Sequence, residues 1–240
     1  YGTDKIILAP GITSAEQLKG KTVAVLEGGL TQIFMAEWLT DNGVGIDEVK
    51  FTNLIMDDAV AAMVGGTAAA AEFWEPFGSQ VLEAMPGSKV AADSTEEKYI
   101  TTAMLGDALY MSTAFLEKRP EDAAKLTKAY FNAVDFWKEN TTEANKIIAD
   151  GLKFSVADVE QVLGSTGEIH KGGIFAFDRD QAAIFMGLKK GKLPLNIVAD
   201  GMKAHWDVTT DWWLKFGFID KAMPMSAGVD TTPLAAALKK

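Results

Sequence analysis

Short strand-like and helix-like segments alternate between residues 20 and 100 of this 240-residue chain, and this alternation constrains the fold most strongly. The β-branched and apolar runs KTVAVLEGG (21–29) and EVKFTNLI (48–55) favour strands. Segments of helical period that end at glycine follow them, LTQIFMAEWLTDNG (30–43) and DDAVAAMVGG (57–66). Strands that alternate with short helices predict an α/β unit with a largely parallel sheet.

Two further strand-like stretches, residues 3–9 and 104–113, flank this unit, and mostly helical patterns follow the second. We therefore expect a complete α/β lobe at residues 10–100, inserted between two crossover strands. Residues 1–9 and 101–240 are expected to supply those crossover strands and the helical remainder of another lobe.

Composition excludes several classes of function. A net charge of −10 argues against a nucleic-acid surface, and the lack of cysteine excludes thiolate metal sites and cysteine nucleophiles. No apolar run approaches the roughly 20 residues that cross a bilayer. Neither histidine, His170 nor His205, stands in a catalytic context, and no phosphate-binding loop is present. We expect a binding protein without metal or cofactor.

Four segments occur in a distinctive order: LKGKTVAVLEGG (18–29), DDAVAAMVGG (57–66), AAAAEFWEPF (68–77) and GDALYMSTAFLEKRPEDAAKLTKAY (106–130). Together they resemble the solute-binding subunits of ABC importers of the nitrate/sulfonate/taurine type. The resemblance implies an α/β type II periplasmic-binding-protein fold, with two lobes joined by two crossover strands. It also implies a monomer that binds a small solute and an ABC transporter permease, in the periplasm or lipid-anchored at the outer face of the membrane.

The chain departs from this family in two ways. The family normally begins with a further half-lobe before the first crossover strand, so we expect the N-terminal half-lobe to be missing here. In addition, Glu72 stands where the family mostly has a small or apolar residue, and Ala69 where it often has aspartate.

The first candidate ligand-binding stretch comprises Glu27, Gly28, Gly29 and Thr31, between a predicted strand and a predicted helix. Ligands of α/β lobes bind at the carboxyl ends of strands, beside helix N-termini. Glycines let the backbone approach a ligand, and the N–H groups of the first helical turn are free to donate. The alternative is that the glycine pair is only a turn.

The second stretch contains Glu72, Trp74 and Glu75, and Asp107 on the second predicted crossover strand completes the candidate set. In a regular strand Glu72 and Trp74 share one face. The resemblance places Trp74 and Glu75 near the ligand. The alternatives are a core aromatic for Trp74 and an N-cap-like carboxylate for Glu75.

The chemistry of these candidates favours one class of ligand. Oxyanions call for guanidinium groups or several N–H donors, but neither arginine, Arg119 nor Arg179, falls in a motif. Carboxylates and tryptophan faces attract cations instead. We therefore expect a small cationic or N–H-rich nitrogen compound, such as guanidine or urea. The alternative ligand is a sulfonate, taurine or nitrate.

Two other classes of protein share the expected fold. A thiamine-precursor-synthase-like enzyme would need a cysteine-rich iron motif, which a chain without cysteine lacks. The effector domain of a transcription regulator would need a DNA-binding segment upstream. Both are weaker alternatives than a transport protein.

Overall fold

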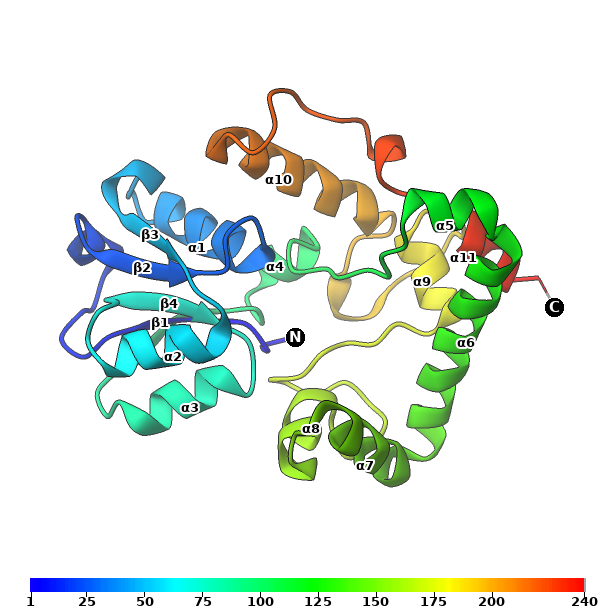
Figure 1. Cartoon of the computed structure of the whole chain (residues 1–240), viewed down its shortest axis with the longest axis horizontal. Coiled ribbons are helices and arrows are strands. Elements are labelled where there is room, and N and C mark those ends of the chain that lie inside the picture. The colour runs from blue at the N-terminus through cyan, green and yellow to red at the C-terminus, as the bar shows by residue number, and fades with distance from the viewer. Residues whose placement is uncertain (240) are drawn as a thin grey trace. The chain divides into compact units, whose positions relative to one another are not determined.

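The computed structural model describes residues 1–239, which fall into two compact units. Unit 1 comprises Tyr1–Glu96, Ala157–Leu163 and His170–Ile174. Unit 2 comprises Glu97–Val156, Gly164–Ile169 and the described residues from Phe175 onward. Both units therefore draw on separate stretches of the chain (Figure 1).

Unit 1 is built on a five-stranded mixed sheet in the order β3-β2-β4-β1-β5. Strand β2 pairs in parallel with β3 and β4, whereas β1 pairs antiparallel with β4 and β5. The expected α/β class is confirmed, but β1 runs against its neighbours inside the sheet. The carboxyl ends of β2, β3, β4 and β5 therefore meet where β1 begins. The strands are β1 (Lys5–Leu8), β2 (Thr22–Val25), β3 (Lys50–Asn53), β4 (Ala70–Phe73) and β5 (Lys89–Asp93).

Three helices cover this sheet: α1 (Leu30–Asp41), α2 (Met56–Val64) and α3 (Phe77–Ala84), with α1 on the side opposite to α2 and α3 (Figure 1). Helix α1 is buried along most of its length, including Thr31 and Gln32 of its first turn. The α2–α3 side holds a buried cluster formed by sheet and helix residues, namely Ile7, Ala24, Met56, Ala59, Met63, Ala68, Ala71, Phe73 and Val81. Short 3₁₀ turns, η1 (Ala15–Leu18) and η2 (Ile46–Glu48), complete the connections.

The small residues of β4 explain how a polar side chain enters this sheet. Ala70 and Ala71 are fully buried, and so are Glu72 and Phe73 that follow them. Alanine side chains allow the flanking helices to approach closely, so the last two residues of the strand are enclosed on both faces.

The described part of unit 2 contains helices and turns. Helix α6 begins with proline at its first position and acidic residues in its first turn, which suit the helix dipole. Its helices are α4 (Glu97–Thr101), α5 (Thr113–Lys118), α6 (Pro120–Glu139), α7 (Thr141–Leu152), α9 (Arg179–Phe185), α10 (Gly201–Phe216) and α11 (Thr232–Ala237), with 3₁₀ turns η3 (Pro194–Asn196) and η4 (Met225–Ala227). Helix α8 (Val156–Leu163) passes from unit 2 into unit 1.

The prediction of a strand at residues 104–113 is wrong. Residues 105–112 are irregular and mostly exposed, and they begin with a turn in which Gly106 N donates to Ala103 O (3.0 Å). A strand needs a neighbour with which to form a ladder, and no described strand pairs with this segment. Within residues 1–239, no helix is both long and apolar enough to cross a membrane.

Candidate functional site

The carboxyl edge of the unit 1 sheet gathers most of the candidate residues. We define this edge as the segments that follow the four co-directional strands (26–29, 54–55, 74–76 and 94–95) together with the start of β1 (2–5). Seven of the predicted ligand-binding residues lie at or beside it, namely Glu27, Gly28, Gly29, Thr31, Glu72, Trp74 and Glu75. Asp107 belongs to unit 2.

The loop between β2 and α1 is held by side chains from the first turn of α1. Leu26 N donates to Thr31 Oγ1 (2.8 Å), and that hydroxyl donates to Leu26 O (3.1 Å). Gly28 N donates to Gln32 Oε1 (2.8 Å), and Gly28 has a φ of +75°, which glycine adopts without strain. Thr31 therefore shapes the loop, and Glu27 is left exposed at its tip.

The N-terminus of α1 opens toward this edge. The first intrahelical bond runs from Ile33 N to Gly29 O (3.3 Å), so the N–H groups of Leu30 and Thr31 have no acceptor inside the helix. The first turn of α1 carries no acidic residue, whereas that of α2 carries Asp57 and Asp58. Free N–H groups and the helix dipole favour an anion at such a terminus.

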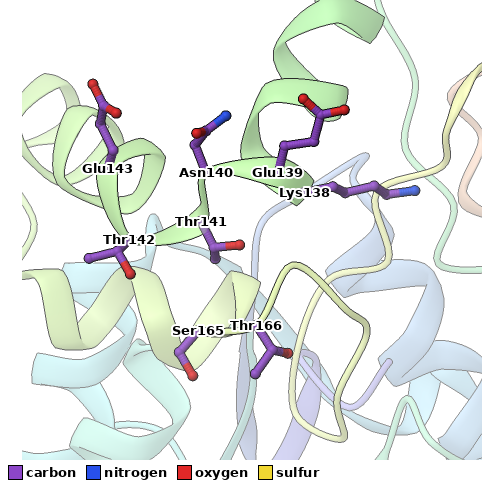
Figure 2. A pocket seen from close by; sticks show the side chains of 8 residues that line it. All are labelled: Lys138, Glu139, Asn140, Thr141, Thr142, Glu143, Ser165 and Thr166. Carbon is purple, nitrogen blue, oxygen red and sulfur yellow. The ribbon is translucent and has the colours of Figure 1, made fainter.

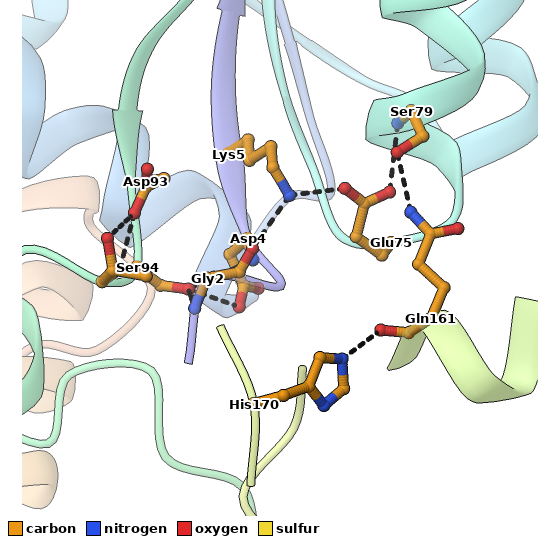
Figure 3. Close-up of polar contacts among 10 residues, drawn as sticks. Gly2, Asp4, Lys5, Glu75, Ser79, Asp93, Ser94, Gln161 and His170 are labelled. Atoms are coloured by element: carbon orange, nitrogen blue, oxygen red, sulfur yellow. Dashed lines mark hydrogen bonds and ion pairs between the residues drawn. The ribbon is translucent and has the colours of Figure 1, made fainter. Parts of the chain in front are cut away.

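Glu75 is engaged on both carboxylate oxygens. Lys5 Nζ lies 2.5 Å from Oε1, and Ser79 N donates to Oε2 (3.0 Å) at the start of α3 (Figure 3). Lys5 also donates to Gly2 O (2.8 Å). The Glu75 side chain is only 4% exposed, so its carboxylate neutralises Lys5 and caps α3, as the N-cap-like alternative described.

Residues from the second half of the chain extend this polar network. Gln161 Nε2 donates to Ser79 Oγ (2.7 Å), and His170 Nε2 lies 2.9 Å from Gln161 O (Figure 3). A carbonyl oxygen only accepts, so Nε2 carries the hydrogen in this contact. Sequence reasoning missed this arrangement, because Gln161 lies 82 positions from Ser79 and carries no motif.

Glu72 is enclosed in the sheet. Its exposure is 0%, and within residues 1–239 neither carboxylate oxygen has a hydrogen-bond partner. Burial, reinforced by the nearby Asp4 carboxylate, raises the pKa of Glu72 well above its ordinary value, although the Lys5 ammonium lowers it. Burial also raises the pKa of Asp4, to about 6. The ligand-binding role of Glu72 stays a prediction, since the side chain does not reach the surface here.

Trp74 lies just beyond the end of β4. Its ring packs against the cluster that contains Phe73 and meets the Phe77 ring edge-on, with centroids 6.1 Å apart. The expectation that Glu72 and Trp74 share a face assumed a regular strand through Trp74; since the strand ends at Phe73, a shared face stays a prediction. Trp74 is half-buried, so part of the ring remains at the carboxyl edge.

Asp107 is exposed in the irregular segment that was expected to be a strand. Its Oδ1 accepts from the backbone N–H of the next residue, Ala108 (2.8 Å). This local contact stabilises the turn. A role for Asp107 in ligand binding stays a prediction.

Unit 2 has a polar hollow of about 420 Å³ at the junction of α6 and α7 (Figure 2). Its lysine is engaged, since Lys138 Nζ lies 3.4 Å from Asp178 Oδ2, and two glutamates stand at its rim. No predicted site residue lines it; the lining residues are Lys138, Glu139, Asn140, Thr141, Thr142, Glu143, Ser165 and Thr166. Across the described residues, no group of three or more histidine, aspartate or glutamate side chains could hold a metal ion.

Comparison with known proteins identifies relatives of this chain by sequence. A Bacillus subtilis (strain 168) protein named "Putative aliphatic sulfonates-binding protein" is 26% identical over 232 residues, which cover 96% of this chain and 60% of that protein. The chain thus spans about 60% of the length of this curated relative.

Two solved structures share the fold, although their sequence identities are low. The periplasmic aliphatic sulphonate binding protein SsuA from Escherichia coli matches with a TM-score of 0.62 at 16% identity, over 95% of this chain and 65% of that one. The periplasmic nitrate-binding protein NrtA from Synechocystis PCC 6803 matches with a TM-score of 0.63 at 14% identity, over 99% and 65%. These likenesses confirm the expected periplasmic-binding-protein type of α/β fold.

A protein-family model also matches the sequence of this chain. The model of the NMT1-like family matches residues 8–152, more than half of the chain. This span includes all four segments on which the resemblance rested. The chain belongs to the NMT1-like family.

Proposed function

We propose that this chain is the solute-binding component of an ABC importer and that its solute is a small oxyanion of the sulfonate or nitrate type. Two relatives are named for binding sulfonates and one for binding nitrate. The observation that carries the proposal is the N-terminus of α1, which presents free N–H groups and no acidic first-turn residue at the carboxyl edge.

The structure weakens the argument for a cationic solute. That argument counted the carboxylates of Glu27, Glu72, Glu75 and Asp107 and the ring of Trp74 as partners of the solute. Glu72 is enclosed, Glu75 is neutralised by Lys5, and Trp74 packs on the apolar cluster. A guanidine-like or urea-like solute therefore loses Glu72 and Glu75 as partners, although Glu27 and Asp107 are exposed. The sulfonate, taurine or nitrate alternative becomes our proposal, because relatives are named for binding sulfonates and nitrate.

The remaining parts of the proposal follow from the importer role. A protein that delivers a solute binds it without chemistry, so no catalytic group or cofactor is required. We propose a permease partner and a location on the outer side of the cytoplasmic membrane, because two structural relatives are named as periplasmic.

Isothermal titration calorimetry tests this proposal with five solutes: ethanesulfonate, taurine, nitrate, guanidinium and urea. We expect heat of binding for at least one of the first three and none for guanidinium or urea. Binding of guanidinium together with no response to any anion would overturn the proposal.

A charge-inserting variant tests the role of α1. Gln32→Glu adds a negative charge in the first turn of α1 and keeps an oxygen that can accept from Gly28 N. We expect anion affinity to fall several-fold, corresponding to about 1 kcal/mol of lost dipole interaction. Gln17→Glu is the control for added charge: Gln17 Oε1 also accepts a backbone N–H, from Thr13 (2.7 Å), but the side chain is exposed and lies in η1, between the end of β1 and the start of β2. Equal affinities for both variants would contradict an anion site at α1.

A further inference from the structure

An unpartnered carboxyl group inside a sheet calls for an explanation. Both oxygens of Glu72 are buried without a hydrogen-bond donor among the described residues, at a position where the strand is enclosed on both faces. A charged carboxylate in such a place is strongly disfavoured, and a neutral carboxylic acid is tolerated far better. The geometry therefore selects the protonated form.

The neighbouring elements offer little that would hold a charge on Glu72. Its direct partner across the ladder is Ile6, and the two residues that precede Ile6 are charged: Lys5 in β1 and Asp4 just before the strand. Asp4 opposes ionisation, whereas Lys5 favours it but already pairs with Glu75. Strand β2 carries no titratable side chain. The acidic groups of the packed helices are Glu37 and Asp41 in the second half of α1, Asp57 and Asp58 in the first turn of α2, and Glu83 near the end of α3.

Glu72 also lies close to the carboxyl edge. It is the residue before the last one of β4, and the β2–β4 register, Val23 with Ala70 and Ala24 with Ala71, places Val25 beside it. Val25 leads directly into the loop that starts α1. Water drawn toward a charge at Glu72 would enter between β4 and the base of that loop.

We propose that Glu72 is a proton-linked switch: its protonated carboxyl keeps the carboxyl edge of unit 1 closed, and loss of this proton to solvent at higher pH loosens β4 and the start of α1. The inference does not depend on which solute is bound. It assigns the carboxyl a regulatory role in place of a ligand contact.

The sign of the pH effect follows from the direction of the shift. A group whose pKa is higher in the folded state stabilises the fold below its unfolded pKa, and this contribution is lost as pH rises through its folded pKa. Asp4, whose pKa burial raises to about 6, loses its stabilising contribution as pH rises through that value. Burial raises the pKa of Glu72 well above its ordinary value, so its contribution is lost in the same direction, as pH rises. At a pH between the unfolded-state and the folded-state pKa of one such group, the folding equilibrium constant falls by up to tenfold for each pH unit.

Urea unfolding of the wild type and of Glu72→Gln between pH 6.5 and 8.5 tests the switch. The glutamine amide of the variant is also buried without partners, which changes the free energy of unfolding by the same amount at every pH. We therefore compare how steeply the free energy of unfolding changes with pH in the two proteins. We expect the folding constant of the wild type to fall several-fold more per pH unit than that of Glu72→Gln. Asp207→Asn, in the exposed pair with Lys203, serves as the control and should keep the wild-type slope. Parallel slopes for the wild type and Glu72→Gln would overturn the proposal.

Two further measurements test the switch. The first shows which residues loosen at higher pH, and the second does not require a folded Glu72→Gln variant. Amide hydrogen exchange of residues 70–73 and 30–41 is compared between wild type and Glu72→Gln at the same pH, and the ratio of the wild-type rate to the variant rate should rise several-fold from pH 6.5 to pH 8.5. If the variant does not fold, a ¹³C-glutamate titration of the wild type decides. A Glu72 carboxyl that titrates near its ordinary pKa of 4.5 would refute the switch.

Discussion

Removing the charge of Glu75 is expected to destabilise unit 1 far more than removing a surface charge. In Glu75→Gln the side chain keeps its size, but the Lys5 ammonium loses its counter-ion. The two side chains are 17% and 4% exposed, for Lys5 and Glu75 respectively. The pair is therefore shielded from water, and breaking it leaves an uncompensated charge.

The magnitude follows from this burial. Breaking a buried pair costs about 3–5 kcal/mol, but Lys5 keeps its bond to Gly2 O and remains partly hydrated, so we expect about 2–3 kcal/mol. For a chain of this size, each kcal/mol lowers the melting temperature by roughly 2–4 °C, which predicts a fall of about 4–12 °C. Differential scanning calorimetry and urea unfolding at pH 7 measure both quantities.

An exposed pair with the same separation provides the control. Lys203 Nζ and Asp207 Oδ2 also lie 2.5 Å apart, but their side chains are 57% and 53% exposed. Asp207→Asn should cost no more than about 0.5 kcal/mol. In the double variant Lys5→Met/Glu75→Gln, part of the loss should be recovered, because the orphaned ammonium is gone. Equal, small losses in Glu75→Gln and Asp207→Asn would refute the argument from burial.

Two other substitutions give sharp expectations. Gly28→Ala places a side chain at a φ of +75° and should lower the free energy of unfolding by about 1–2 kcal/mol in urea titrations. Gly151→Ala is its control: Gly151 lies inside α7 with open space around it, so this substitution should not destabilise the protein. Asn145→Ala removes a fully buried amide that accepts from Trp137 Nε1 (2.9 Å) and donates to Gly164 O (2.8 Å), and should cost about 2–4 kcal/mol, seen as a lower urea midpoint and a shift in Trp137 fluorescence. A stable Asn145→Ala variant would show that the two orphaned groups find other partners.

Local patterns predicted the elements of unit 1 well. The periodicity of residues 21–29 and 30–43 anticipated β2 and α1, since the glycines that stop these segments act within a few residues. The antiparallel placement of β1 could not be predicted, because strand order depends on contacts such as Ile6 with Glu72, which are distant in sequence. The stretch 104–113 looked like a strand by composition, but no neighbouring strand pairs with it among the described residues.

The candidate site was predicted in position but not in chemistry. Chain order was enough to place the β2–α1 loop and the end of β4 at one edge. The partner of Glu75, however, is Lys5, which lies 70 positions away and has no motif. Whether a carboxylate is free, paired or enclosed is decided by such contacts. The expectation of a cationic solute counted Glu72 and Glu75 as available, which the structure shows they are not.

The division of unit 1 between distant stretches of chain has a consequence for its biosynthesis. Residues 1–96 form the sheet and its helices early, but the contacts of Gln161 and His170 require the chain to reach residue 174. At elongation rates of about 5–20 residues per second, this interval lasts roughly 4–16 s. During that time Ser79 lacks its partner and the side of α3 that receives α8 is uncovered.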